Sequence, residues 1–136
     1  MLHPATVKSI AQSFHDPSDG QALKSQELIS LLLDASPDPF SRSQHTPGHI
    51  TCTGLVFAPD RDRILLVHHR RLNRWLLPGG HVESDDAEIW DAARREVCEE
   101  TSVVLEPDAA PQLAGMDVHG IPSVGSAVGL GEIADI

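Results

Sequence analysis

The chain has 136 residues, 40% of them hydrophobic, and its 20 acidic against 10 basic side chains give a formal net charge of −10 at pH 7. This length allows one compact domain with its own core but not comfortably two. The negative charge opposes non-specific binding to polyanions, which argues against a protein that coats nucleic acid. No apolar run approaches the roughly 20 residues that span a bilayer, so a membrane-spanning protein is excluded.

Cysteine usage and the N-terminus indicate the compartment. Cys52 and Cys98 are the only cysteines, and they lack the CxxC spacing of metal or redox sites. The first residues show neither the positive start nor the apolar run of a signal peptide. The cytoplasm is therefore the expected location.

Residues 1–48 are predicted to form a helical extension and a linker. Two short helices are expected before about Asp34, separated where Pro17 and Gly20 interrupt the pattern. Residues 35–48 hold three prolines and many polar side chains, which is typical of a linker or an ordered loop. The second helix has apolar residues at helical spacing, which predicts a face packed on a sheet: Leu28, Ile29, Leu32 and Leu33.

Residues 49–122 are predicted to form the core domain, because the pattern changes there to strands. Runs at residues 50–57 and 64–68 flank a polar turn, which predicts a β-hairpin. A third apolar run, residues 75–77, leads into Pro78-Gly79-Gly80, where regular structure is expected to end. Residues 116–119 fit another strand. Residues 123–136, in which small residues alternate with glycine, are predicted to be an irregular tail.

A helix is predicted over residues 87–101. Asp85 or Asp86 is the expected N-cap, and Glu88 lies three residues after Asp85, as in a capping box. Arg95 stands four residues before Glu99, close enough to fix that carboxylate by a charged hydrogen bond, although a plain surface ion pair is equally consistent with the spacing.

Three glutamates of this helix form a candidate metal site. On a helix, Glu96, Glu99 and Glu100 project within an arc of roughly 100°. Like charges so placed repel one another unless a cation lies between them, and hard divalent ions prefer oxygen ligands. The alternative is an acidic face turned to water. Because the glutamates border the apolar stripe of the helix, geometry alone leaves the two interpretations evenly balanced.

The loop before the helix supports the first interpretation. Gly79 and Gly80 lie just ahead of the helix N-terminus, where backbone amides attract anions and free carbonyls can reach a metal. A lone Gly-Gly pair is otherwise typical of a simple turn, so this signal depends on the helix that follows.

Taken together, Leu77-Pro-Gly-Gly-His-Val-Glu83 and Ala92-Ala-Arg-Arg-Glu-Val-Cys-Glu-Glu-Thr101 resemble the Nudix box, Gly-x5-Glu-x7-Arg-Glu-U-x-Glu-Glu-x-Gly-U, with U aliphatic. The sixth residue after Gly80 is Asp86 instead of Glu, and eight residues separate it from Arg95 instead of seven. Ser102 replaces the glycine that ends the helix, at a cost of about 1 kcal/mol. The remaining box positions are in register: Arg95, Glu96, Val97, Glu99, Glu100 and Val103.

The resemblance implies an α/β (α+β) fold, a Nudix-like mixed β-sheet packed between helices, with N-terminal helices and an incomplete C-terminal part. It implies Mg²⁺, or Mn²⁺, held by Glu96, Glu99, Glu100 and the carbonyl of Gly80, while Arg95 orients a glutamate. Water then attacks phosphorus, so the expected activity is hydrolysis of a pyrophosphate bond in a nucleoside diphosphate derivative: a nucleotide sugar, a dinucleotide or a nucleoside triphosphate. The expected catalytic residues are Arg95, Glu96, Glu99 and Glu100, with Glu96 or Glu100 as the base.

The expected partner is a small nucleotide-type substrate, and neither nucleic acid nor a membrane is expected. A basic cluster precedes Trp75, and although it could meet phosphate or a nucleobase, a solvated loop is the favoured interpretation: His68, His69, Arg70, Arg71 and Arg74.

The C-terminal residues indicate an alternative to hydrolase activity. The family normally continues with further strands and a closing helix, whereas residues 123–136 look unlike that continuation, as after a change of reading frame. The alternative is thus a truncated, catalytically impaired Nudix-like protein that acts as a binding or interaction module. An acidic scaffold whose helix merely faces water is a second rival. A sheet edge left by truncation favours a homodimer.

Overall fold

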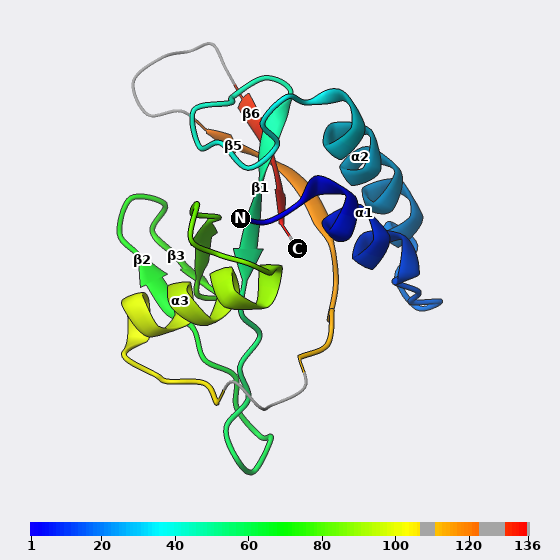
Figure 1. Ribbon diagram of the computed structural model, residues 1–136. Coiled ribbons are helices and arrows are strands. Elements are labelled where there is room, and N and C mark those ends of the chain that lie inside the picture. Colours follow the sequence, from blue (N-terminus) through cyan, green and yellow to red (C-terminus); the bar gives the residue numbers. More distant parts are fainter. Residues whose placement is uncertain (107–110, 123–129, 136) are drawn as a thin grey trace.

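The computed structural model describes residues 1–106, 111–122 and 130–135. The described residues form three helices and six strands in two sheets (Figure 1). In chain order they are α1 (Pro4–Ser13), α2 (Ala22–Ala35), β1 (Gly48–Thr53), β2 (Val67–His69), β3 (Arg74–Leu76), β4 (Gly79–His81), α3 (Ile89–Thr101), β5 (Asp117–Pro122) and β6 (Leu130–Asp135).

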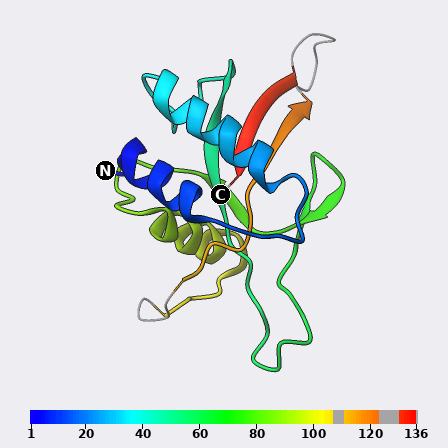
Figure 2. The same cartoon turned by 90° about the vertical axis from the view of Figure 1, so that its right-hand side faces the viewer.

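The two predicted N-terminal helices are confirmed, with their break at residues 14–21. They pack side by side, and α2 also contacts β1 and β5 (Figure 2). Two residues of the predicted apolar face of α2, Ile29 and Leu33, are buried. Leu28 is exposed and Leu32 is half-buried, so the face that meets the sheet is narrower than the sequence pattern indicated.

The main sheet has the order β4-β1-β6-β5. β1 pairs antiparallel with β4 and parallel with β6, while β5 pairs antiparallel with β6. The sheet is therefore mixed, as expected; α2 contacts it at β1 and β5, and α3 contacts it at β1 and β4. Among the described residues β4 and β5 are the edges; a homodimer formed through such an edge stays a prediction.

The predicted irregular tail is wrong for its last part. Leu130–Asp135 forms β6, in the middle of the main sheet. The glycine-rich pattern offered few side chains to pack, but a central strand is held by backbone hydrogen bonds to neighbours on both sides, which the pattern does not reveal. Residues 123–129 and 136 lie outside the described residues.

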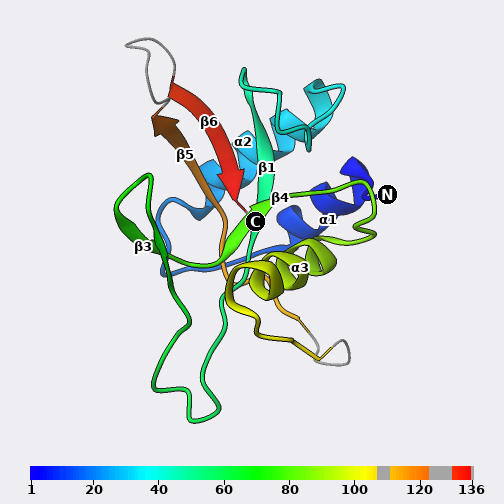
Figure 3. The same ribbon diagram turned by 90° about the vertical axis from the view of Figure 1, so that its left-hand side faces the viewer.

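The predicted hairpin is present in a modified form. β1 ends at Thr53, and beyond it the chain is paired by a bridge between Phe57 and Ile64, with the Leu65 amide donating to the Val56 carbonyl at 2.9 Å. This hairpin projects from the body of the protein (Figure 3). The chain then forms the separate two-stranded ribbon β2–β3.

Regular structure does not end at Gly79-Gly80, contrary to the prediction. Gly79–His81 forms β4, which pairs with β1. A Cβ at Gly79 would lie 2.7 Å from the carbonyl oxygen of Cys52, so the glycine permits a close approach of the two strands that any side chain would prevent.

Helix α3 begins two residues later than predicted, and its N-cap is Glu88 instead of Asp85 or Asp86. The Glu88 side chain accepts from the amide of Asp91, whose carboxylate in turn accepts from the Glu88 amide at 3.1 Å. Asp86 is unavailable as a cap because it is bonded to Arg95. At the other end Ser102 has φ 61°, the left-handed conformation expected for the position of the box glycine.

The core forms where all three helices meet β1. Ile50 and Cys52 of β1 are fully buried against residues of α1, α2 and α3. No helix in the described ranges is both long enough and apolar enough to cross a membrane. The cluster of buried core residues consists of Leu2, Val7, Ala11, Ile29, Leu33, Ile50, Cys52, Ile89, Ala92 and Met116.

Candidate functional site

The candidate site lies where α3 packs against β1 and β4. Ile89, Ala92 and Val97 are the buried residues of α3, so the helix is anchored along one face and its glutamates lie beside that face. Glu96 points at Gly80 of β4: a Cβ added at Gly80 would stand 2.7 Å from the Glu96 carboxylate. The glycine therefore leaves the space that this carboxylate occupies.

Arg95 connects the helix to the preceding loop. Its guanidinium binds both carboxylate oxygens of Asp86, from Nε to Oδ1 at 3.2 Å and from Nη2 to Oδ2 at 2.8 Å. Nη2 also donates to the backbone carbonyl of His81 at 2.8 Å. Nη1 donates to Glu96 at 2.9 Å and to Glu99 at 3.4 Å. Arg95 thus donates to three carboxylates, where its spacing to Glu99 had indicated one.

Burial and these bonds shift the ionisation of the site. Burial raises the pKa of Glu96 above its ordinary value; the hydrogen bond and charge of Arg95 oppose this, while Glu99 and Glu100 add to it. Burial also tends to raise the pKa of Asp86, but hydrogen bonds from Arg95 and the Glu83 amide, with the Arg95 charge, bring that pKa below its ordinary value. The same bond to Asp86 raises the pKa of Arg95 further, so Arg95 is a permanent cation.

The other two glutamates are exposed. Glu100 Oε2 accepts a hydrogen bond from the Gly79 amide at 3.3 Å, while Glu99 points toward Arg95. Within the described part of the chain, no three His, Cys, Asp or Glu side chains converge closely enough to hold an ion as they stand. Glu96 and Glu99 share Arg95 Nη1 as their donor, whereas Glu100 accepts from Gly79, so the positive guanidinium offsets the repulsion between two of the three carboxylates.

The donor set nevertheless fits a hard divalent cation. Carboxylates and a backbone carbonyl are the ligands that Mg²⁺ takes, together with water. The backbone of Gly80 lies beside the Glu96 carboxylate, since a Cβ there would stand 2.7 Å from it. A bound ion would replace repulsion between Glu96, Glu99 and Glu100 with attraction.

Sequence reasoning did not place two of the residues around this site. Asp86 was noted as a possible helix cap and as the replacement for the box Glu, but its pairing with Arg95 was not predicted. No sequence pattern pointed to His49, because its contact with His81 depends on how β1 pairs with β4. It is buried and stacks on His81 with ring centroids 5.1 Å apart, and its Nε2 has no hydrogen-bond partner.

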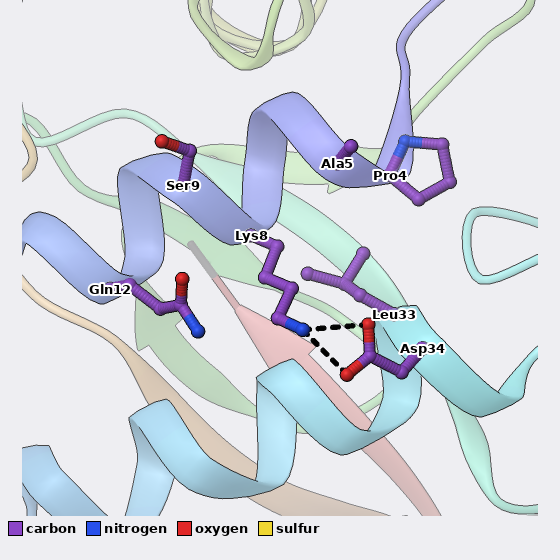
Figure 4. Close-up of a pocket in the computed structure, with 7 residues that line it drawn as sticks. All are labelled: Pro4, Ala5, Lys8, Ser9, Gln12, Leu33 and Asp34. Atoms are coloured by element: carbon purple, nitrogen blue, oxygen red, sulfur yellow. Dashed lines mark hydrogen bonds and ion pairs between the residues drawn. The ribbon is translucent and has the colours of Figure 1, made fainter.

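A separate hollow lies between the N-terminal helices (Figure 4). Its charged groups neutralise each other, since Lys8 Nζ binds both carboxylate oxygens of Asp34 at 2.8 and 2.6 Å. None of the predicted site residues lines it, and we assign no chemistry to it. The lining comes from α1 and α2: Pro4, Ala5, Lys8, Ser9, Gln12, Leu33 and Asp34.

Comparison with known families adds an independent finding. The family model of the NUDIX domain matches residues 48–123, more than half of the chain. The match begins at the first residue of β1 and includes every predicted site residue as well as Asp86.

Proposed function

Because the chain belongs to the Nudix hydrolase family, we propose that it hydrolyses a pyrophosphate bond of a nucleoside diphosphate derivative with the help of Mg²⁺. Members of this family generally use divalent cations and act on small nucleotide-type substrates. The observation that carries the proposal is the set of bonds made by Arg95, which holds the glutamate-bearing side of α3 against β4.

Three glutamates would hold the ion, namely Glu96, Glu99 and Glu100, with the carbonyl of Gly80. When bound, Mg²⁺ would neutralise charge on the pyrophosphate and lower the pKa of coordinated water. Arg95 stays charged and keeps Glu96 turned toward the site. Burial makes the Glu96 carboxylate more basic than a free one, a property that suits a group that accepts a proton from water. Glu100, which is exposed, is the alternative base.

The test is an assay of pyrophosphate-bond hydrolysis with Mg²⁺ or Mn²⁺ across nucleotide sugars, dinucleoside polyphosphates and nucleoside triphosphates. The parent should turn over at least one class, and EDTA should abolish the reaction. Glu96→Gln and Glu100→Gln should each lower kcat by about 100-fold or more. Glu27→Gln, an exposed change on α2, is the matched control and should leave kcat unchanged.

Two results would sink this proposal. One is the absence of turnover with every substrate class and both metals. The other is turnover in Glu96→Gln and Glu100→Gln at the rate of the parent. Either would favour the alternative, a Nudix-like protein that serves as a binding or interaction module.

A further inference from the structure

The ribbon β2–β3 exposes one of the two tryptophans of the protein. Trp75 of β3 is 67% exposed. It stands directly opposite His68 of β2, and the two rings meet edge to face with centroids 5.1 Å apart. Leaving so much apolar surface in water is unfavourable by about 25 cal/mol for each Å², which marks Trp75 as a candidate contact residue.

The alternation of the strands fixes the direction in which Trp75 faces. Val67 and Leu76 are paired with each other on one face of the ribbon, and both are half-buried against the protein. Trp75 and His68 lie on the opposite, outer face. Ile64 and Leu66, which lead into β2, are exposed as well. Trp75 is thus part of an apolar platform turned to solvent.

Basic side chains surround this platform in an otherwise acidic protein. Five of the ten Lys and Arg residues lie between positions 61 and 74, where only one of the twenty acidic residues, Asp62, is found. Arg70, Arg71 and Arg74 are exposed, and in the described ranges none of them forms an ion pair. Arg74 is paired with His69 and so starts from the face of Val67 and Leu76, which leaves Arg70 and Arg71 at the ribbon turn as the cations for this platform. At physiological salt, charges are screened beyond a Debye length of about 8 Å. An anion near the ribbon would therefore be attracted by these basic side chains and would be little affected by the negative net charge of the chain.

The ribbon is joined directly to the candidate site. β3 leads through two residues to Gly79, whose amide donates to Glu100 at 3.3 Å. The four residue steps from Trp75 to Gly79 span at most about 14 Å. Moving away from Glu100 and back along the chain from Gly79, one therefore meets first the carboxylate, then the ring of Trp75, and then the arginines at the ribbon turn.

We propose that this ribbon binds the nucleoside portion of the substrate, with the base stacked on Trp75 and a further anionic group held by Arg70 and Arg71. The inference rests on the proposed function and narrows its substrate class. It selects nucleoside diphosphate derivatives with a charged group beyond the nucleoside, such as dinucleoside polyphosphates, over nucleotide sugars with a neutral second substituent.

Binding is tested without turnover by fluorescence. The chain has two tryptophans, so Trp90→Phe leaves Trp75 as the sole reporter. In EDTA, AMP should change the emission of this variant saturably, whereas ribose 5-phosphate, which has no base, should not. No change with AMP, or an equal change with both compounds, would overturn the inference even if the parent hydrolyses nucleotides.

Kinetics test the selectivity. Trp75→Ala should raise KM for diadenosine tetraphosphate about tenfold with kcat nearly unchanged, the range expected for loss of one stacking contact. Arg70→Gln/Arg71→Gln should raise KM for diadenosine tetraphosphate at least threefold more than KM for UDP-glucose. Leu23→Ala, an equally exposed apolar residue on α2, is the control and should leave both constants unchanged.

The two proposals fail separately. If AMP perturbs Trp75 but no substrate is hydrolysed, the proposed function is wrong and the binding ribbon stands. If hydrolysis occurs and the KM values of Trp75→Ala match those of the parent, the ribbon does not bind substrate and the hydrolase remains.

Discussion

Asp86 and Arg95 form a two-point ion pair across the loop that precedes α3, with O···N distances of 2.8 and 3.2 Å and an Asp86 side chain only 6% exposed. Asp86→Asn would leave the Arg95 cation partly buried without its main counter-charge. We expect the free energy of unfolding, measured with urea at pH 7, to fall by about 3 kcal/mol. Asp85→Asn, its exposed neighbour, should change it by less than about 0.5 kcal/mol.

This pair also predicts a pH dependence. The pKa of Asp86 is lower in the folded protein than its ordinary value of 3.8, so its stabilising effect is present above about pH 4 and is lost as the pH falls through the lowered value. The stability difference between the parent and Asp86→Asn should accordingly shrink below pH 4. A difference that stays constant down to pH 2 would show that the charge of Asp86 is not what stabilises the fold.

The contribution of Glu96 to stability should depend on pH in the opposite direction. Its pKa is raised above 4.5 in the folded state, so in the absence of metal stability decreases as the pH rises through that pKa. Glu96→Gln, a neutral mimic, should raise Tm in EDTA at pH 7, and this gain should vanish below about pH 4.5. The same variant should be inactive. A Tm in EDTA at pH 7 that is lower than that of the parent would contradict the burial argument.

Gly80→Ala tests the space beside Glu96. The new Cβ would lie 2.7 Å from the Glu96 carboxylate, which must then move away from β4. We expect the Kd for Mn²⁺, measured by titration, to rise at least about tenfold. Gly115→Ala is the control, because a Cβ there meets nothing within 4 Å. Equal Mn²⁺ affinity in both variants would show that this space is not needed for the ion.

The left-handed Ser102 at the end of α3 predicts a stabilising substitution. Glycine takes φ 61° without strain, so Ser102→Gly should raise the free energy of unfolding by about 0.5–1 kcal/mol. Ser9→Gly, at an exposed position inside α1, should lower it by a similar amount, because glycine there only adds conformational freedom to the unfolded chain. Measurements by urea unfolding that show both substitutions destabilising would refute the first expectation.

The helices and the glutamate face were predictable because their signals are local. The 3.6-residue periodicity of α2 and the box spacing around Glu96 are both contained within a few helical turns. β4 was missed because Gly79-Gly80 is a turn signal, and only the approach of Thr53 and Cys52 shows why glycine is required there. The pairing of Asp86 with Arg95 required knowing that the cap position belongs to Glu88.

What could not be predicted depends on contacts between distant segments. The stack of His49 on His81 follows from the register of β1 and β4, in which Thr51 lies opposite His81. No local pattern in either segment specifies that register. The exposure of Trp75 likewise depends on which face of the ribbon meets the protein body.

The position of β6 has a consequence for the order in which this protein assembles. β1 pairs with β6 from Gly48, opposite Glu132, to Thr51, opposite Asp135, and among the described strands β5 is paired with β6 alone. The central pairing of the sheet must therefore wait until its last strand has left the ribosome, and until then β1 has an open backbone edge beside its pairing with β4. Such non-local pairing is slow and leaves strand edges free to associate. For this chain, synthesis is the stage at which self-association is hardest to avoid.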